Sequence, residues 1–149
     1  MRKDLDELLC QKYPKMMVNR NKDMQETCMC WGFECGDGWF QILDSLMGNI
    51  QNHIDWNNKN FEKGYTQYKQ VPQVTLDQVK EKFGTLRFYY TGGDDYISGL
   101  VSMAESMSAV TCESCGHPGE QTRGGWIKTN CKPCEEKRKA EREALYGKD

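Results

Sequence analysis

The sequence predicts an α+β fold, in which a small sheet of two or three strands packs with three helices and a treble-clef-like zinc finger follows. Apolar and polar side chains alternate over 85–91, which is typical of a half-buried strand. Over 38–55 the apolar side chains instead recur every three or four positions, as on one face of a helix. Near the C-terminus, two Cys-x2-Cys pairs have the spacing of a zinc site.

The first predicted element is a short amphipathic helix over 3–12. Leu5, Leu8 and Leu9 recur at helical spacing on one side of this segment. Pro14 disfavours helical backbone at the residue before it, so the helix is expected to end there.

A strand and a long helix are predicted next. Bulky and small residues alternate over 28–33, which predicts a strand with one bulky face. The glycines on either side of Asp37 end that strand, and the Asp37 carboxylate is the expected N-cap of a helix over 38–55. Asparagines within 57–60 are expected to end this helix, and 57–72 is interpreted as a loop or an edge strand.

The segment 75–84 has the pattern of a capped helix. Thr75 and Gln78 are spaced as a capping box, and Gly84 supplies a C-terminal stop. The strand over 85–91 follows directly.

A third helix is predicted after the Gly92–Gly93 turn, with Asp94 or Asp95 as its N-cap. Its buried side is expected to contain Ile97, Leu100, Val101, Ala104 and Met107. We interpret 1–110 as one core domain and 111–149 as a separate zinc finger with a charged C-terminal helix.

Four cysteines are the predicted ligands of one structural zinc ion: Cys112, Cys115, Cys131 and Cys134. Two residues between paired cysteines let one tight turn direct both sulfurs at the same ion. Because thiolates would fill all four positions, no place is left for a reactive water.

The order of elements around these cysteines favours a treble clef over a plain zinc ribbon. Gly116 permits the turn of a metal knuckle, and Pro133 suits the first turn of a helix expected over 135–146. His117 follows the knuckle directly and is interpreted as a surface residue rather than a ligand.

A second metal site is a weaker alternative. Cys28, Cys30 and Cys35 would need Cys10 or His53 as a fourth ligand, and their spacing is irregular. We interpret them as buried, inert thiols, because free cysteine is among the most buried residue types.

Five residues are candidates for a ligand pocket: Asp37, Trp39, Arg87, Tyr89 and Asp94. Helix capping explains Asp94 more simply, and Arg87 is typical of a solvated strand face. An enzyme would require Asp37, Arg87 and Asp94 to converge in a deep cleft.

The charge pattern weakens a nucleic-acid interpretation, because the formal net charge is −2. The candidate phosphate contacts would be Lys128, Lys132, Lys137, Arg138 and Arg142, but glutamates are interleaved with them. No apolar run approaches the ~20 residues of a membrane span, so we expect no membrane partner. Eight cysteines without an apolar signal core indicate a reducing cytosol.

Several motifs, taken in order, resemble a family of small bacteriophage and prophage proteins that have a C-terminal four-cysteine finger. These motifs are Cys35-Gly36-Asp37-Gly38-Trp39-Phe40, the segment 82–90, Ala104-Glu105, the segment 111–119 and Gly124-Gly125-Trp126-Ile127. The resemblance covers roughly residues 28–134. It implies a phage accessory protein in the cytoplasm of a bacterial host, and it implies no particular activity.

Three functions remain open on the sequence alone. The first is a non-enzymatic, zinc-stabilised protein that binds or inhibits a host protein or small signalling molecule, with a counter-defence role as one form. The second is a nucleic-acid-associated regulator that uses the finger and its basic helix, which steep salt dependence would reveal. The third is the enzyme described above.

Overall fold

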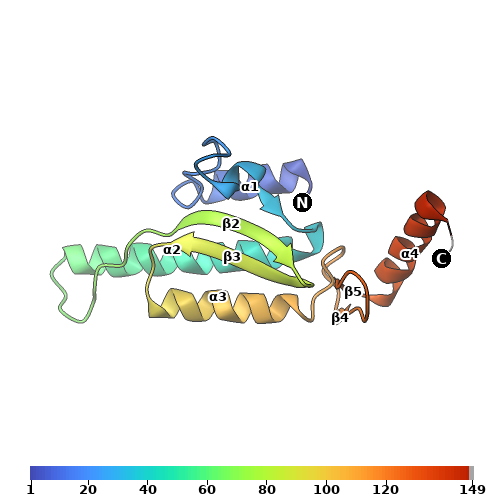
Figure 1. Ribbon diagram of the computed structural model, residues 1–149. Coiled ribbons are helices and arrows are strands. Elements are labelled where there is room, and N and C mark those ends of the chain that lie inside the picture. The colour runs from blue at the N-terminus through green and yellow to red at the C-terminus, as the bar shows by residue number, and fades with distance from the viewer. Residues whose placement is uncertain (148–149) are drawn as a thin grey trace.

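Within residues 1–147, which the computed structural model describes, three helices and a three-stranded sheet precede a small two-stranded sheet and a fourth helix (Figure 1). The elements are α1 (Lys3–Lys12), β1 (Phe33–Glu34), α2 (Phe40–Glu62), β2 (Thr75–Lys82), β3 (Thr85–Thr91), α3 (Asp95–Ser108), β4 (Glu120–Gln121), β5 (Thr129–Asn130) and α4 (Lys132–Tyr146). This is the predicted α+β class. We call residues 111–147 the C-terminal module.

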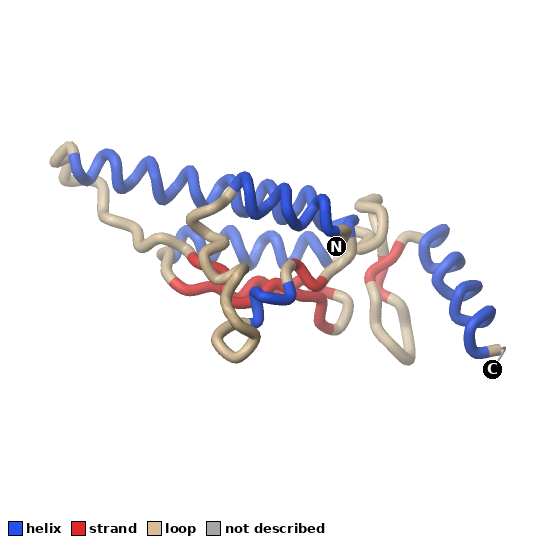
Figure 2. Tube along the Cα trace, turned by 90° about the horizontal axis from the view of Figure 1, so that it is seen from above, coloured by secondary structure: helices blue, strands red, loops and turns tan. Residues whose placement is uncertain are grey.

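The larger sheet has the order β1–β2–β3, with β1 parallel to β2 and β2 antiparallel to β3. In Figure 1, α2 passes behind this sheet and α3 lies beside β3, and Figure 2 shows α2 and the strands as separate layers. Contacts join α3 to both β3 and α2. The side chains between these elements form one hydrophobic core, which includes Leu9, Phe33, Trp39, Leu43, Met47, Ile50, Val79, Leu86, Phe88 and Ile97.

Residues 75–82 form strand β2, so the predicted helix over 75–84 is wrong. Leu76 and Val79 are both fully buried, and this spacing imitates a helix. A β-bulge between Leu76 and Gln78 inserts one extra residue, which lets both apolar side chains face the core from a strand. Pairing with β3 therefore overrides the local capping pattern. The predicted strand over 85–91 is confirmed as β3.

The predicted strand over 28–33 is also wrong, because Cys28–Trp31 is a short 3-10 helix. The Thr27 hydroxyl accepts the Met29 N–H at 3.0 Å, which favours a turn over a strand. Trp31 is 62% exposed, so the bulky side chains do not share one buried face. Only Phe33–Glu34 pairs with β2, as the edge strand β1.

Helix α2 ends at Glu62, well beyond the predicted end at residue 55. Its asparagines donate to carbonyls one turn earlier: Asn57 Nδ2 to His53 O and Asn60 Nδ2 to Trp56 O, both at 2.8 Å. The asparagine side chains therefore hydrogen-bond to carbonyls of the preceding turn, and the helix continues through them. Asp37 begins a 3-10 helix before α2 and makes no side-chain cap, contrary to the prediction.

The remaining helices form where the sequence predicts them, but Met107, expected on the buried side of α3, is 47% exposed. Helix α1 has the predicted bounds, and Asp94 caps α3 by accepting the Ile97 N–H at 3.0 Å. Helix α4 begins at Lys132, three residues earlier than predicted, with Pro133 in its first turn. Across residues 1–147, none of the helices combines the length and the apolar character that crossing a bilayer requires.

Candidate metal centre

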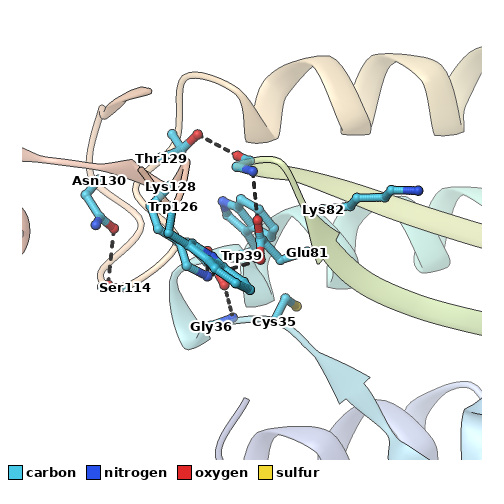
Figure 3. A network of polar contacts seen from close by, with 12 residues as sticks. Cys35, Gly36, Trp39, Glu81, Lys82, Ser114, Trp126, Lys128, Thr129 and Asn130 are labelled. Carbon is cyan, nitrogen blue, oxygen red and sulfur yellow. Dashed lines mark hydrogen bonds and ion pairs between the residues drawn. The ribbon is translucent and has the colours of Figure 1, made fainter. Parts of the chain in front are cut away.

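The C-terminal module is fixed to the core by the segment that precedes α2 (Figure 3). The Gly38 N–H donates to the Glu113 carbonyl at 2.7 Å, and the Gly36 N–H donates to Glu113 Oε1 at 3.0 Å. Trp39 is fully buried, and its indole Nε1–H donates to the Thr111 carbonyl at 2.9 Å. The backbone and the side chain of Glu113 thus accept hydrogen bonds from two amides of the segment before α2.

Gly38 is required by this close approach. A Cβ at this position would lie 2.1 Å from the Cys112 carbonyl oxygen, which is a backbone atom and cannot rotate away. Glycine is therefore the residue that lets α2 begin directly against the first cysteine pair.

A second joint connects the module to the turn between β2 and β3. The Thr129 hydroxyl donates to the Gly84 carbonyl at 2.5 Å. The Lys128 ammonium lies between two largely buried carboxylates, 3.1 Å from Glu81 Oε2 and 3.4 Å from Glu113 Oε2. Lys128 therefore joins sheet and module, and its charge is used within the protein rather than offered to phosphate.

The four predicted cysteines come together in this module. Their Sγ atoms all lie within 4.8 Å of one another, and Cys115 Sγ is 3.6 Å from Cys131 Sγ. A tetrahedron with metal–sulfur bonds of about 2.3 Å has an edge of about 3.8 Å. The cluster therefore has the dimensions of a four-thiolate metal site, and the prediction of these four ligands agrees with the structure.

The pKa values of the cluster thiols differ, because their surroundings differ. Burial would raise the pKa of the Cys112 thiol, but hydrogen bonds from the backbone amides of Cys131, Cys115 and Ser114 outweigh it and lower that pKa to about 7. Hydrogen bonding with Cys131, together with burial, raises the pKa of Cys134 to about 12. The backbone thus favours the thiolate of Cys112, and a bound cation would favour the thiolate of Cys134.

Side chains around the cluster hold it in place. Asn130 Oδ1 accepts from the Ser114 hydroxyl at 3.4 Å, and Asn130 Nδ2 donates to Glu135 Oε2 at 2.9 Å. Arg138 clamps the same carboxylate with bonds of 2.9 and 2.6 Å. These bonds from Arg138, and then from Asn130, lower the pKa of Glu135 to about 2. The first turn of α4 is thereby fixed against the hairpin.

His117 is exposed beside the cluster, as predicted. Its Nδ1 lies 3.3 Å from Cys115 Sγ, so it is a hydrogen-bonding neighbour of a ligand. The cysteine group that has metal-site dimensions does not include it.

The five candidate pocket residues are not brought together. Asp37 accepts the Arg2 N–H at 2.7 Å, Arg87 pairs with Glu105 at 3.7 Å, and Tyr89 is 44% exposed on β3. Trp39 is buried at the joint beyond the C-terminus of α3, whereas Asp94 caps the N-terminus of α3. These two ends are separated by 14 residues of helix, about 20 Å.

The five predicted phosphate contacts also separate. Lys128 is engaged as described, and Lys137 pairs weakly with Glu141 at 3.9 Å on an exposed face. The other three belong to a cleft of about 910 Å³ between the hairpin and α4, whose cations are Arg123, Lys132, Arg138, Lys139 and Arg142. Three glutamates, Glu120, Glu135 and Glu136, line the same cleft.

No second metal cluster forms within the part of the chain that the structure describes. Cys35 is buried, and burial raises the pKa of its thiol to about 12. Cys28 is exposed, so the expectation of a buried thiol fails there. His53 is held elsewhere, with its Nε2 2.8 Å from Asp94 Oδ2.

Comparison with protein families, with curated protein sequences and with solved structures finds no match for this chain.

Sequence reasoning missed the joint residues and the exposed aromatics near them. Glu113 lies between the cysteines of the first pair, and nothing in its spacing indicates a bond to Gly36. Phe83 is the one described non-glycine residue with positive φ, at 53°, and it is 66% exposed. The sequence indicates this residue only through the following Gly84, because a two-residue hairpin turn usually has asparagine, aspartate or glycine before its glycine, not a bulky residue.

Proposed function

We propose that this protein is a non-enzymatic, zinc-stabilised binding protein of bacteriophage type that acts in the cytoplasm of a bacterial host. Its target would be a host protein or a small signalling molecule, which it would block or redirect, and counter-defence is one form of this action. The observation that carries the proposal is the pair of exposed aromatic residues, Phe83 and Trp126, at the joint between sheet and module.

Zinc is the metal that best suits the four thiols. Sulfur-only tetrahedral sites hold zinc or iron–sulfur centres, and isolated four-cysteine knuckles of this spacing are typical of zinc. With four protein sulfurs no ligand position remains for water, so the ion would be structural. The order of knuckle, hairpin and helix supports a treble-clef finger.

The aromatic pair has the character of a binding surface. Phe83 is 66% exposed and Trp126 is 70% exposed. Their chain neighbours lie close together, because a Cβ added at Gly84 would be only 3.1 Å from Ile127 Cγ2. Tryptophan is strongly enriched among residues that dominate binding energy. Phe83 also adopts a strained left-handed conformation while burying little of its ring, so the fold itself gains little from it.

The proposal is tested by capture from bacterial lysate on the immobilised protein, followed by mass spectrometry and by measurement of affinity for the captured component. We expect Trp126→Ala to reduce retention by about tenfold or more. Trp31→Ala is the matched control, because Trp31 is similarly exposed at 62% but lies outside the joint. Retention that both variants leave unchanged, or lose equally, would contradict the proposed surface.

Nucleic acid remains a second candidate because of the cleft between the hairpin and α4. Among the described residues that line it, Arg123 and Lys132 make no ion pair within 4.0 Å. Binding to a single-stranded oligonucleotide that weakens steeply with salt, and that Lys132→Gln weakens further, would favour this function. Against it, a four-thiolate zinc site carries a net negative charge, which would repel phosphate.

A further inference from the structure

The imidazole of His53 is held by three side chains where α3 begins beside the second half of α2. Asn57 Nδ2 lies 3.2 Å from His53 Nδ1 and, because an amide nitrogen can only donate, Nδ1 accepts this bond. His53 Nε2 then carries the ring hydrogen and donates to Asp94 Oδ2 at 2.8 Å. The Tyr96 ring stacks on the imidazole, with centroids 4.2 Å apart and planes inclined by 22°. Since both ring nitrogens are occupied, His53 supports a surface and is not free to take a proton from a ligand.

This ring lines a pocket of about 550 Å³ between the two helices. Four of the lining residues share one face of α2, at i, i+3, i+4 and i+7 spacing: Asn49, Asn52, His53 and Trp56. Tyr96 lines the pocket from α3. Asn49 also lines an apolar groove of about 160 Å³ that continues between α2 and α3. Pockets of about 300–1,000 Å³ with a few polar groups are typical of small-molecule sites.

Two aromatic rings of the pocket are oriented by neighbours but left largely uncovered. Trp56 is 59% exposed and Tyr96 is 56% exposed. Tyr96 is placed by its stack on His53, and Trp56 by a T-shaped contact with Tyr68, with centroids 6.4 Å apart. Exposed aromatic faces of fixed orientation suit a planar ring, which can stack on them.

The polar groups that the pocket offers to a ligand carry no net charge. The Asn52 amide has no hydrogen-bond partner among residues 1–147, so its donor and its acceptor are both available. Two charged residues line the pocket, Asp55 and Lys59, and their charges offset each other. Asp55 also accepts from Gln51 at 2.9 Å and lies 3.7 Å from Lys15.

Two further carboxylates at the start of α3 disfavour an anionic ligand. Asp94 is occupied by His53 and by the Ile97 amide, and Asp95 is exposed outside the pocket lining. A phosphate group beside them would meet like charge. The chemistry of the pocket therefore fits an uncharged planar ring with hydrogen-bonding groups on its edge.

We propose that this pocket binds an uncharged purine, as the free base or the nucleoside, with the ring stacked on an aromatic face and its edge bonded by Asn52. An asparagine amide matches the adjacent donor and acceptor of adenine in a bidentate pair. The pocket is at the N-terminal end of α3, whereas Phe83 and Trp126 are at the joint beyond its C-terminal end. The inference therefore goes beyond the proposed function and does not depend on it.

Isothermal titration calorimetry of the full chain with adenosine tests the proposal, and uridine, adenosine monophosphate and glucose are the comparison ligands. Adenosine is expected to bind with a Kd below about 1 mM, and more tightly than each of the other three. Tyr96→Ala and Asn52→Ala should each weaken adenosine binding about tenfold. Tyr65→Ala is the matched control, because Tyr65 is 52% exposed outside the pocket lining and should leave binding unchanged.

Adenosine that does not bind at millimolar concentration overturns the proposal. Glucose or adenosine monophosphate binding as tightly as adenosine overturns the assigned ligand class. A loss that Tyr65→Ala shares, or that neither pocket variant causes, overturns the assigned site. Circular dichroism checks the fold of each variant. Trp126→Ala should not change adenosine binding, so failure of this site and failure of the proposed partner surface are distinguishable.

Discussion

At the scale of single residues, the module is joined to the core by a few side chains that each make two contacts at once. Glu113 uses both its carbonyl and its carboxylate to bind the turn before α2. The Lys128 ammonium pairs both with that carboxylate and with the carboxylate of Glu81. Removing one member of such a partly buried network leaves the others unpaired, which costs more than the lost bond itself.

Gly38→Ala is expected to destabilise the protein by about 1–3 kcal/mol, because its Cβ would overlap the Cys112 carbonyl. Gly99→Ala is the matched control, since a Cβ there meets nothing within 4 Å inside α3. It should stabilise the helix by up to about 1 kcal/mol. Urea unfolding at one low protein concentration measures both changes. Equal effects of the two substitutions would contradict the close packing at Gly38.

The Asp94 carboxylate is expected to make the free energy of unfolding depend on pH. Burial alone would raise its pKa, but hydrogen bonds from His53 and from the Ile97 amide outweigh it and lower the pKa below the ordinary 3.8. Since the folded pKa is the lower one, the stabilisation is complete above about pH 4 and is lost as the pH falls below it. Asp94→Asn keeps a capping side chain, so the wild type should exceed it by only about 0.5–1 kcal/mol at pH 5.

Urea unfolding from pH 5 to pH 2.5, with chelator present for both proteins, follows this difference. The gap between wild type and Asp94→Asn should close toward the acid end. A gap that is constant over this range would show that the Asp94 carboxylate contributes no charge-dependent stability.

At the scale of elements, strand β2 shows how a tertiary partner overrides a local pattern. Thr75 and Gln78 have helix-capping spacing, and Leu76 and Val79 have helical spacing. A bulge lets residues with this spacing face the core from a strand. Pairing with β3 at seven positions adds interactions between strands that a helix over the same residues would not make. The pair then closes through a two-residue turn, Phe83 and Gly84, with positive φ at both residues.

Phe83→Asn is expected to stabilise the β2–β3 turn by about 1 kcal/mol, because asparagine adopts left-handed backbone more easily than a bulky residue. Phe83→Ala is the control, since it removes the ring but keeps a Cβ at positive φ and should change stability less. Thermal unfolding compares the three proteins. If asparagine destabilises the protein, the ring contributes to the fold and the argument for a binding role of Phe83 fails.

At the scale of the whole molecule, the cysteine cluster and the core are connected by two joints, one at Gly36–Trp39 and one at the β2–β3 turn. Most helical residues lie in α1, α2 and α3, whereas the described part of α4 has no buried residue. Metal binding is therefore expected to stabilise the module directly and the core only through these two joints.

Cys115→Ser is expected to release the metal and to abolish amide protection over 112–146, while α2 and the β2–β3 pair stay protected. Metal analysis and hydrogen exchange measure these effects. Cys28→Ser, at an exposed thiol outside the cluster, should keep the metal. If protection is lost across the sheet as well, the core and module fold as one unit and the predicted boundary at 110/111 is wrong.

The sequence by itself determined those elements, and the cysteine site, that depend on residues close together in the chain. Helices α1, α3 and α4 follow from apolar spacing and caps, β3 follows from strict alternation, and the four candidate metal ligands follow from cysteine spacing. Each of these depends on residues a few positions apart, so a pattern along the chain is sufficient.

Only the tertiary structure decided the rest. The bulge in β2, the bonds from the Gly36 and Gly38 amides to Glu113, and the apolar groove between α2 and α3 each join residues distant in the chain. The physical reason is that a strand and an interface are defined by their partners, whereas a helix or a metal knuckle closes most of its bonds within itself.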